Sequence, residues 1–172
     1  MQEFSCLLRT NLLSDFAMLS PNIGAEVIYR KKMSLVFDYS VGFYLPDADF
    51  HYHSFHSLMA EIRYYLSSSK SDVTKGHHLG AYAQLGTYDF MYEGKGFQCK
   101  PYTDTYAIGL CYGYTHPINR QFKIDFAFGL GCLHTKYAEY KRYNDMYIHT
   151  DTKSFTKVLP TRAEITLVWV IK

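Results

Sequence analysis

Residues 60–66 read AEIRYYL and place two charged side chains inside an otherwise apolar stretch. Successive side chains of a β-strand point to opposite faces, so Glu61 and Arg63 share one face of an extended chain. Ile62 and Leu66 share the other face. Such a strand borders two different environments, and identifying these two environments decides the fold.

Eight segments of the chain alternate with this same period of two. Residues 105–115, for example, set Tyr, Ile and Leu side chains against Thr, Ala, Gly and Cys. Glycines inside several segments disfavour helix, and helical spacing competes in none of them. We expect strands at about residues 4–13, 23–30, 34–44, 55–66, 78–88, 105–115, 122–132 and 162–171.

The connections between these strands fall into two sets. Shorter turns are predicted at 30–33, 67–75 and 116–119, and longer connections at 14–22, 45–54, 89–102 and 134–160. Strands joined by short turns at one end and long loops at the other form an up-and-down barrel. The chain has 172 residues, which is the size of one domain, so we assign residues 1–172 to a single barrel. The predicted fold is all-β, an eight-stranded antiparallel up-and-down barrel.

The two faces of the strands differ in the size of their side chains. One face carries the charged residues and most of the strand glycines, and the other carries rows of long aliphatic and aromatic side chains. An eight-stranded barrel encloses an interior only just wide enough for side chains, so the bulky rows fit better outside. We therefore predict a transmembrane β-barrel with a polar, side-chain-filled interior. Glu61 and Arg63 then face the interior, whereas Ile62, Tyr64 and Leu66 face lipid.

The charges on the polar face have matched signs. Unpaired charge in a closed interior is costly, so the balance predicts an internal salt-bridge network with a structural role. The predicted members are Arg9, Glu26, Arg30, Asp38, Glu61, Arg63, Lys123, Asp125, Arg162 and Glu164. Aromatic residues near strand ends also fit the girdles that mark membrane interfaces, namely Tyr29, Tyr44, Tyr64, Tyr114 and Trp169.

Composition excludes several other classes of function. A net charge of +2 gives no reason to expect nucleic acid as a partner. No run approaches the roughly 18 apolar residues of a transmembrane helix. The four cysteines match no zinc or redox spacing. The first residues show no secretory signal, and we expect that one was removed before this numbering begins.

Residues 47–56, DADFHYHSFH, are the best candidates for a metal site. His51, His53 and His56 could supply ligands together with the two aspartates of this stretch. Zinc sites usually hold such ligands at a rigid spacing, and here His56 falls on the opposite face from His51 and His53. A polar surface loop is therefore favoured, and we predict no metal and no cofactor.

The last long connection contains His149, Asp151 and Ser154, which could act on lipid or peptide in an outer-membrane enzyme. No nucleophile-elbow pattern accompanies them, so we predict no enzymatic activity. An outer-membrane enzyme and a soluble lipocalin-like ligand carrier remain the two alternatives. The pair His77-His78 is expected at the membrane interface rather than in a ligand site.

Several short motifs, taken in their order along the chain, resemble one known family. They are TNLL at 10–13, PNIGAE at 21–26, EIRYYL at 61–66, GHHLG at 76–80, GTY at 86–88, and the glycine-rich stretches 109–113 and 129–131. Over nearly its whole length the chain is similar to an uncharacterised (DUF-type) family of small eight-stranded outer-membrane β-barrel proteins of Bacteroidetes-type bacteria. Genes for such proteins often lie near fimbrial or other surface-assembly genes. The family often has Trp where this chain has Tyr65.

This resemblance implies a place in the cell outer membrane and no established activity. The expected role is that of a non-catalytic structural or accessory protein. It would be a subunit of a larger outer-membrane or cell-surface complex, such as an assembly machine, a transporter or a fimbria-associated system. The expected partners are outer-membrane lipid and other outer-membrane proteins.

Overall fold

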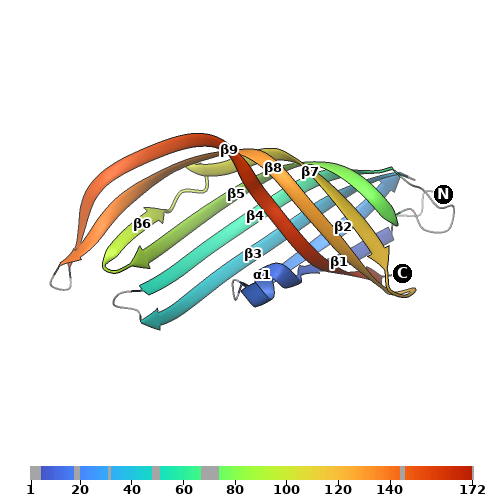
Figure 1. The fold of residues 1–172 in the computed structure, drawn as a ribbon, viewed down its shortest axis with the longest axis horizontal. Helices are drawn as coiled ribbons and strands as arrows, with labels where there is room; N and C mark the ends of the chain where they lie inside the picture. The colour runs from blue at the N-terminus through green and yellow to red at the C-terminus, as the bar shows by residue number, and fades with distance from the viewer. Residues whose placement is uncertain are drawn as a thin grey trace.

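The structure is a computed structural model that describes residues 5–17, 20–30, 32–47, 51–66, 74–143 and 146–171. These residues form an all-β fold of antiparallel strands with one short helix (Figure 1). The elements are β1 (Ser5–Asn11), α1 (Leu12–Ala17), β2 (Asn22–Arg30), β3 (Met33–Asp47), β4 (His51–Tyr65), β5 (Gly76–Tyr92), β6 (Lys95–Cys99), β7 (Thr105–Pro117), β8 (Phe122–Tyr143) and β9 (Met146–Ile171).

Eight of the nine strands close into a ring. Strands β1 to β5 pair in chain order, β5 then pairs with β7, β7 with β8, β8 with β9, and β9 with β1. Strand β6 pairs with the last residues of β5 on one side and with β8 on the other. It takes the place between these two strands that β7 occupies in the ring. The prediction of eight strands was therefore one short, because β6 lies within the predicted connection 89–102.

A tight turn at Glu93 and Gly94 produces the extra strand. Both residues have positive φ, 49° at Glu93 and 73° at Gly94. Two successive positive φ values are typical of the type I′ turns that match the twist of a β-hairpin. Glycine adopts this conformation without a steric penalty. The turn therefore folds β6 directly back onto β5.

Helix α1 is the second departure from the sequence prediction. The side-chain oxygen of Asn11 accepts hydrogen bonds from the backbone N–H groups of Leu13 at 3.1 Å and Ser14 at 3.4 Å. Asn11 thus caps the helix, and the predicted strand 4–13 ends there instead of continuing. Within the described part of the chain, no helix is long and apolar enough to cross a membrane.

The ring is closed over only part of the height of the longest strands. β9 pairs with β1 only from Thr166 to Ile171. On β3, the ladder with β2 runs from Met33 to Ser40. Beyond these points β3, β4, β5, β6, β8 and β9 continue as a curved sheet, which we call the distal sheet (Figure 1). Much of the predicted connections 45–54 and 134–160 is therefore strand.

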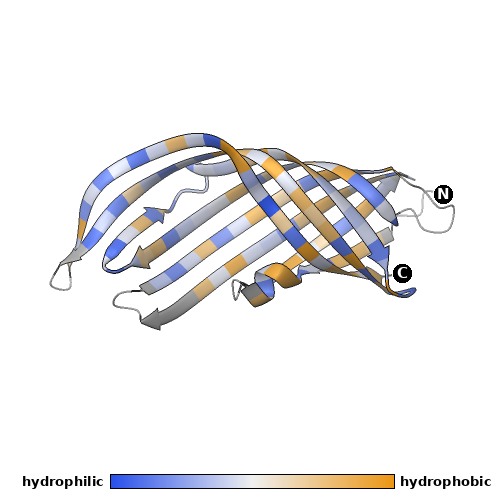
Figure 2. Cartoon of the chain, in the orientation of Figure 1, coloured by the Kyte–Doolittle hydropathy of each residue, from blue (hydrophilic) through white to orange (hydrophobic). Residues whose placement is uncertain are grey.

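The predicted orientation of the two faces in the ring is confirmed. Phe37, Leu110 and Phe126 are 53%, 70% and 47% exposed on the outer face, whereas Arg162 is only 6% exposed. The same alternation runs along the ring portions of the strands, where hydrophobic and hydrophilic residues succeed one another (Figure 2). The ring therefore has an ionic interior and an apolar exterior.

Both faces change character where the ring gives way to the distal sheet. On β5 the outer face passes from Leu85 to Thr87 and Asp89, and the inner face passes from Gln84 to Tyr88 and Phe90. Strands β4, β8 and β9 change in the same way at the same height. The distal sheet thus has a polar outer face and an aromatic inner face, which is the reverse of the ring.

Close packing at Gly109 yields a first prediction. A Cβ atom there would lie 2.4 Å from the backbone oxygen of Leu130, so Gly109→Val forces the β7 and β8 backbones apart. We expect overpacking to cost about 1–3 kcal/mol of unfolding free energy, measured by urea titration of the purified protein. Ala83→Val, on the exposed outer face of the neighbouring strand, is the control. Equal stabilities of the two variants would contradict this packing.

Candidate functional site: an ionic core and an aromatic chamber

Arg63 is the centre of the charged groups inside the ring. Its side chain has no exposed surface, and its Nε lies 2.8 Å from Oε2 of Glu61. Its Nη1 lies 2.8 Å from Oδ2 of Asp125 and 3.8 Å from Oε2 of Glu26. These carboxylates come from β4, β8 and β2, so a single guanidinium joins three sides of the ring. A buried cation is tolerated only with such partners.

Asp125 is a carboxylate with four side-chain partners inside the ring. Besides Arg63 it lies 3.4 Å from Nη2 of Arg9, and it accepts a hydrogen bond of 2.8 Å from Thr115. The Nε2 atom of His78 is also 2.8 Å from Asp125. A carboxylate can accept about four hydrogen bonds, and the surroundings of Asp125 use this capacity.

Arg162 extends the network toward the distal sheet. It is 2.8 Å from Glu61 and 2.7 Å from Glu164, and its guanidinium lies 5.5 Å from the ring centroid of Tyr82. Glu26 is bound on the opposite side by Arg9 at 2.9 Å and by Tyr65, whose hydroxyl donates at 2.5 Å. The charges therefore form one connected set rather than separate pairs.

The structure places nine of the ten residues predicted for the network in the interior of the ring. They are Arg9, Glu26, Asp38, Glu61, Arg63, Lys123, Asp125, Arg162 and Glu164. Lys123 is buried and hydrogen-bonded to Thr74, and Asp38 lies at the distal margin, 3.7 Å from Arg9. Arg30 lies in β2, but its side chain is outside the described part. We call these nine residues, with His78, the ionic core.

Sequence reasoning missed His78 and Tyr65 as members of this interior. His77 lies on the outer face, where its ring contacts Tyr112 and Tyr114, but His78 is fully buried, so the interfacial prediction for His78 was wrong. The signal was present, because His78 alternates in phase with Gly80. Tyr65 likewise alternates in phase with Glu61 and Arg63, and it is 1% exposed.

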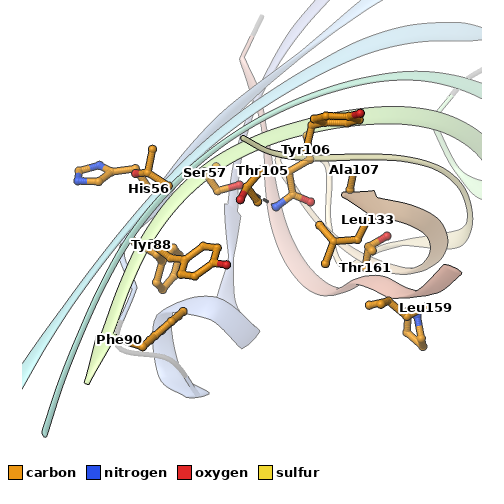
Figure 3. Close-up of a pocket in the computed structure, with 15 residues that line it drawn as sticks. His56, Ser57, Tyr88, Phe90, Thr105, Tyr106, Ala107, Leu133, Leu159 and Thr161 are labelled. Carbon is orange, nitrogen blue, oxygen red and sulfur yellow. Dashed lines mark hydrogen bonds between the residues drawn. The ribbon is translucent and has the colours of Figure 1, made fainter. Parts of the chain in front are cut away.

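An aromatic chamber lies beyond the ionic core, on the inner face where the distal sheet begins. It is a cavity of about 310 Å³ whose walls include Phe55, Tyr88, Phe90, Leu133 and Leu159. Figure 3 shows Tyr88, Leu133 and Thr161 directed toward the space, whereas the ring of His56 points away from it. None of the fifteen residues that line it is Asp, Glu, Lys or Arg. The chamber is therefore suited to an uncharged, apolar group.

Hydrogen bonds hold the polar residues of the chamber wall in fixed positions. Gln84 donates to Ser57 at 2.7 Å, and the hydroxyls of Tyr88 and Thr135 are 2.8 Å apart. Tyr82 and Thr161 are bonded to each other where the chamber meets the ionic core. Because these groups bond one another, the chamber is a preformed space.

His53 and His56, the described histidines of the stretch weighed as a metal site, have separate contacts. His53 contacts the ring of Phe90, and His56 bonds the hydroxyl of Tyr39 at 2.9 Å on the outer face. The side chain of His51 lies outside the described part. Among the residues whose side chains are described, no group of three or more His, Cys, Asp or Glu is arranged to hold a metal ion.

The residues weighed for catalysis lie along β9 rather than in a loop. His149 bonds Thr152 at 3.0 Å, and Asp151 lies 3.9 Å from Lys153. Ser154 is exposed and pairs with Lys136 in the β8–β9 ladder. These contacts do not join His149, Asp151 and Ser154 to one another.

Comparison with known protein families matches residues 2–171 to the model of DUF3575, described as a protein of unknown function. The chain belongs to this family. No curated protein and no solved structure matches it. The expected resemblance to an uncharacterised family is therefore confirmed at that level, and the DUF3575 match covers both the ring and the distal sheet.

The ionic core yields a second prediction for this DUF3575 protein. Arg63→Met keeps a long side chain but leaves Glu61, Asp125 and Glu26 without their shared cation. Breaking a buried ion network in this way should lower the unfolding free energy by about 3–5 kcal/mol, measured by urea titration of the purified protein. Lys136→Met, which removes an exposed cation from β8, should leave the transition unchanged. A similar midpoint for both variants would refute the central role of Arg63.

Proposed function

We propose that the protein is a non-catalytic β-barrel of the bacterial outer membrane. In this proposal it is a structural or accessory subunit of a larger cell-surface complex. The ring is the membrane anchor, and the distal sheet stands outside the hydrocarbon. Resemblance to small barrels of Bacteroidetes-type bacteria supports this assignment.

The outer apolar band of the ring is the observation that carries the proposal. On β4 it runs from Leu58 to Leu66 and on β8 from Ile124 to Cys132, which is about nine residues on each strand. A transmembrane β-strand needs about 9–11 residues to cross the hydrocarbon. Beyond the band the outer face becomes polar at His56 and at His134, as expected where strands leave lipid.

The ionic core argues against a carrier or a channel. A soluble carrier would place apolar side chains around the axis of the ring, but Arg63, Glu61 and Asp125 occupy it. Because an eight-stranded ring is just wide enough for its own side chains, this filled interior leaves no path for solutes. The position of the charges thus favours an anchor over a conduit.

The distal sheet is the part suited to contacts with partner proteins. From Met146 to Ile165, β9 pairs with β8 along one edge, and its ladder with β1 begins only at Thr166. A long strand edge offers backbone donors and acceptors to another chain. Charged residues such as Asp151 and Lys153 keep this edge from pairing indiscriminately, which leaves it available for a specific subunit.

Fractionation of the native cells tests location and assembly together. We expect the protein in the membrane pellet after a carbonate wash, and chemical cross-linking before gentle detergent extraction should retain at least one other outer-membrane protein. Recovery in the soluble pool would overturn the membrane assignment. A pure monomer after cross-linking would overturn the subunit role while leaving the anchor intact.

A charge placed in the apolar band gives a third prediction. Phe128 is 53% exposed at mid-height of the band on β8, and Phe128→Arg would put a guanidinium in the hydrocarbon. We expect a loss of about 2–4 kcal/mol in folding free energy, measured in lipid vesicles. The matched control is Ser154→Arg on the outer face of the distal sheet, which should insert as well as the unmodified chain. Equal effects at the two sites would contradict a membrane boundary between them.

A further inference from the structure

The outer face of the distal sheet contains a second, separate cavity. It has a volume of about 560 Å³, and Tyr52, Asp89, Gln98, Tyr140, Tyr147 and His149 are among the residues that line it. We call it the tyrosine hollow. Asp89 alternates in phase with Leu85 on β5, so the hollow opens on the same side as the apolar band but beyond its upper border. It is therefore distinct from the chamber, which lies on the inner face.

A hydrogen-bond chain fixes the floor of the tyrosine hollow. The hydroxyls of Tyr52 and Tyr140 are 2.5 Å apart, and Tyr140 donates to Oδ1 of Asp89 at 2.5 Å. Gln98 donates to Oδ2 of the same carboxylate. The hydroxyl of Tyr52 also lies 3.0 Å from Oδ1 of Asp89. Each phenol has one proton to donate and lone pairs that accept, so both phenol oxygens keep acceptor capacity for a ligand. The floor thus presents oriented polar groups.

Burial keeps both phenols of this chain in the protonated form. Partial burial raises the pKa of Tyr140, and the hydrogen bond to Asp89 raises this pKa further. Partial burial also raises the pKa of Tyr52. Both hydroxyls therefore remain hydrogen-bond donors and acceptors across the physiological pH range, and the chain Tyr52–Tyr140–Asp89 persists as one rigid unit.

The aromatic rings give the hollow an apolar wall beside this polar floor. A Cβ atom at Gly96 would lie 2.0 Å from the ring of Tyr140, so the glycine lets that ring lie against the β6 backbone. Tyr147 meets Tyr140 edge to face with ring centroids 5.6 Å apart. Tyr147 is 57% exposed, which leaves most of its ring available to a ligand.

These features fit one class of ligand. A pyranose has C–H faces that pack on aromatic rings, and equatorial hydroxyls that exchange hydrogen bonds with carboxylate, amide and phenol groups. Lys100 also lines the hollow and offsets the charge of Asp89, so a neutral ligand is favoured over an ionic one. A volume of about 560 Å³ is typical of small-molecule sites and accommodates one or two sugar units. We propose that the tyrosine hollow binds a neutral mono- or disaccharide unit.

The test uses the full chain in a detergent without a sugar headgroup. Saturation-transfer NMR and titration calorimetry with maltose, lactose and diacetylchitobiose should detect at least one of them, with a dissociation constant on the order of 1 mM. Glucuronate should bind more weakly than the neutral sugars. Failure of all three neutral sugars, or tighter binding of glucuronate, would overturn the proposal.

Two variants separate the hollow from non-specific contacts. Tyr147→Ala removes the exposed ring and should weaken the binding of the detected sugar roughly tenfold or more. Tyr102→Ala removes another exposed tyrosine, outside the hollow, and should leave the affinity unchanged. Equal binding by both variants would place the sugar elsewhere. The outcome does not depend on the membrane assignment, because the hollow can be titrated whether the protein is extracted from membrane or recovered from the soluble pool.

Discussion

The buried guanidinium of Arg63 is the group on which the ring depends. One of its partners, Glu61, comes from the same strand, but Asp125 comes from β8 and Glu26 from β2. These carboxylates reach it only when strands on different sides of the ring stand at the same height. Ionic pairing therefore selects ring closure and strand register together, because a slip of one residue would turn the charged row outward.

The reversal of polarity along the strands follows from where the ring opens. Inside the closed part the charged side chains are buried, and Arg9, Arg63 and Arg162 each pair with a carboxylate from another strand. Beyond Ser40 on β3 and before Thr166 on β9 no ladder joins the edges of the described sheet, so opposing carboxylates and guanidiniums are no longer held together. Aromatic side chains such as Tyr88 and Phe90 then provide the inner contacts. The outer face, no longer apolar, carries groups such as Asp89 that bond water or one another.

Alternation in eight segments of the chain predicts the ring, and the charged residues on one face of these segments predict the ionic core apart from His78. The helix was missed because an Asn cap at Asn11 is a short-range signal that a period-two pattern obscures. Strand β6 was missed because Glu93-Gly94 is a weaker hairpin signal than Asn-Gly or Asp-Gly. The sequence does not predict the distal half of β9, because residues 146–158 are exposed on both faces and lack the alternation that marks a strand against a core.

Strand length shows why the apolar band is only part of this protein. β8 has 22 residues and β9 has 26, whereas crossing the hydrocarbon takes about 9–11. About half of each strand therefore lies beyond the apolar band, and the two strands form an arched hairpin at one end of the molecule (Figure 1). A membrane anchor, as proposed above, would by itself have no need of this extension. The chamber on its inner face and the tyrosine hollow on its outer face give the extension two chemically different surfaces, and our proposals place recognition there.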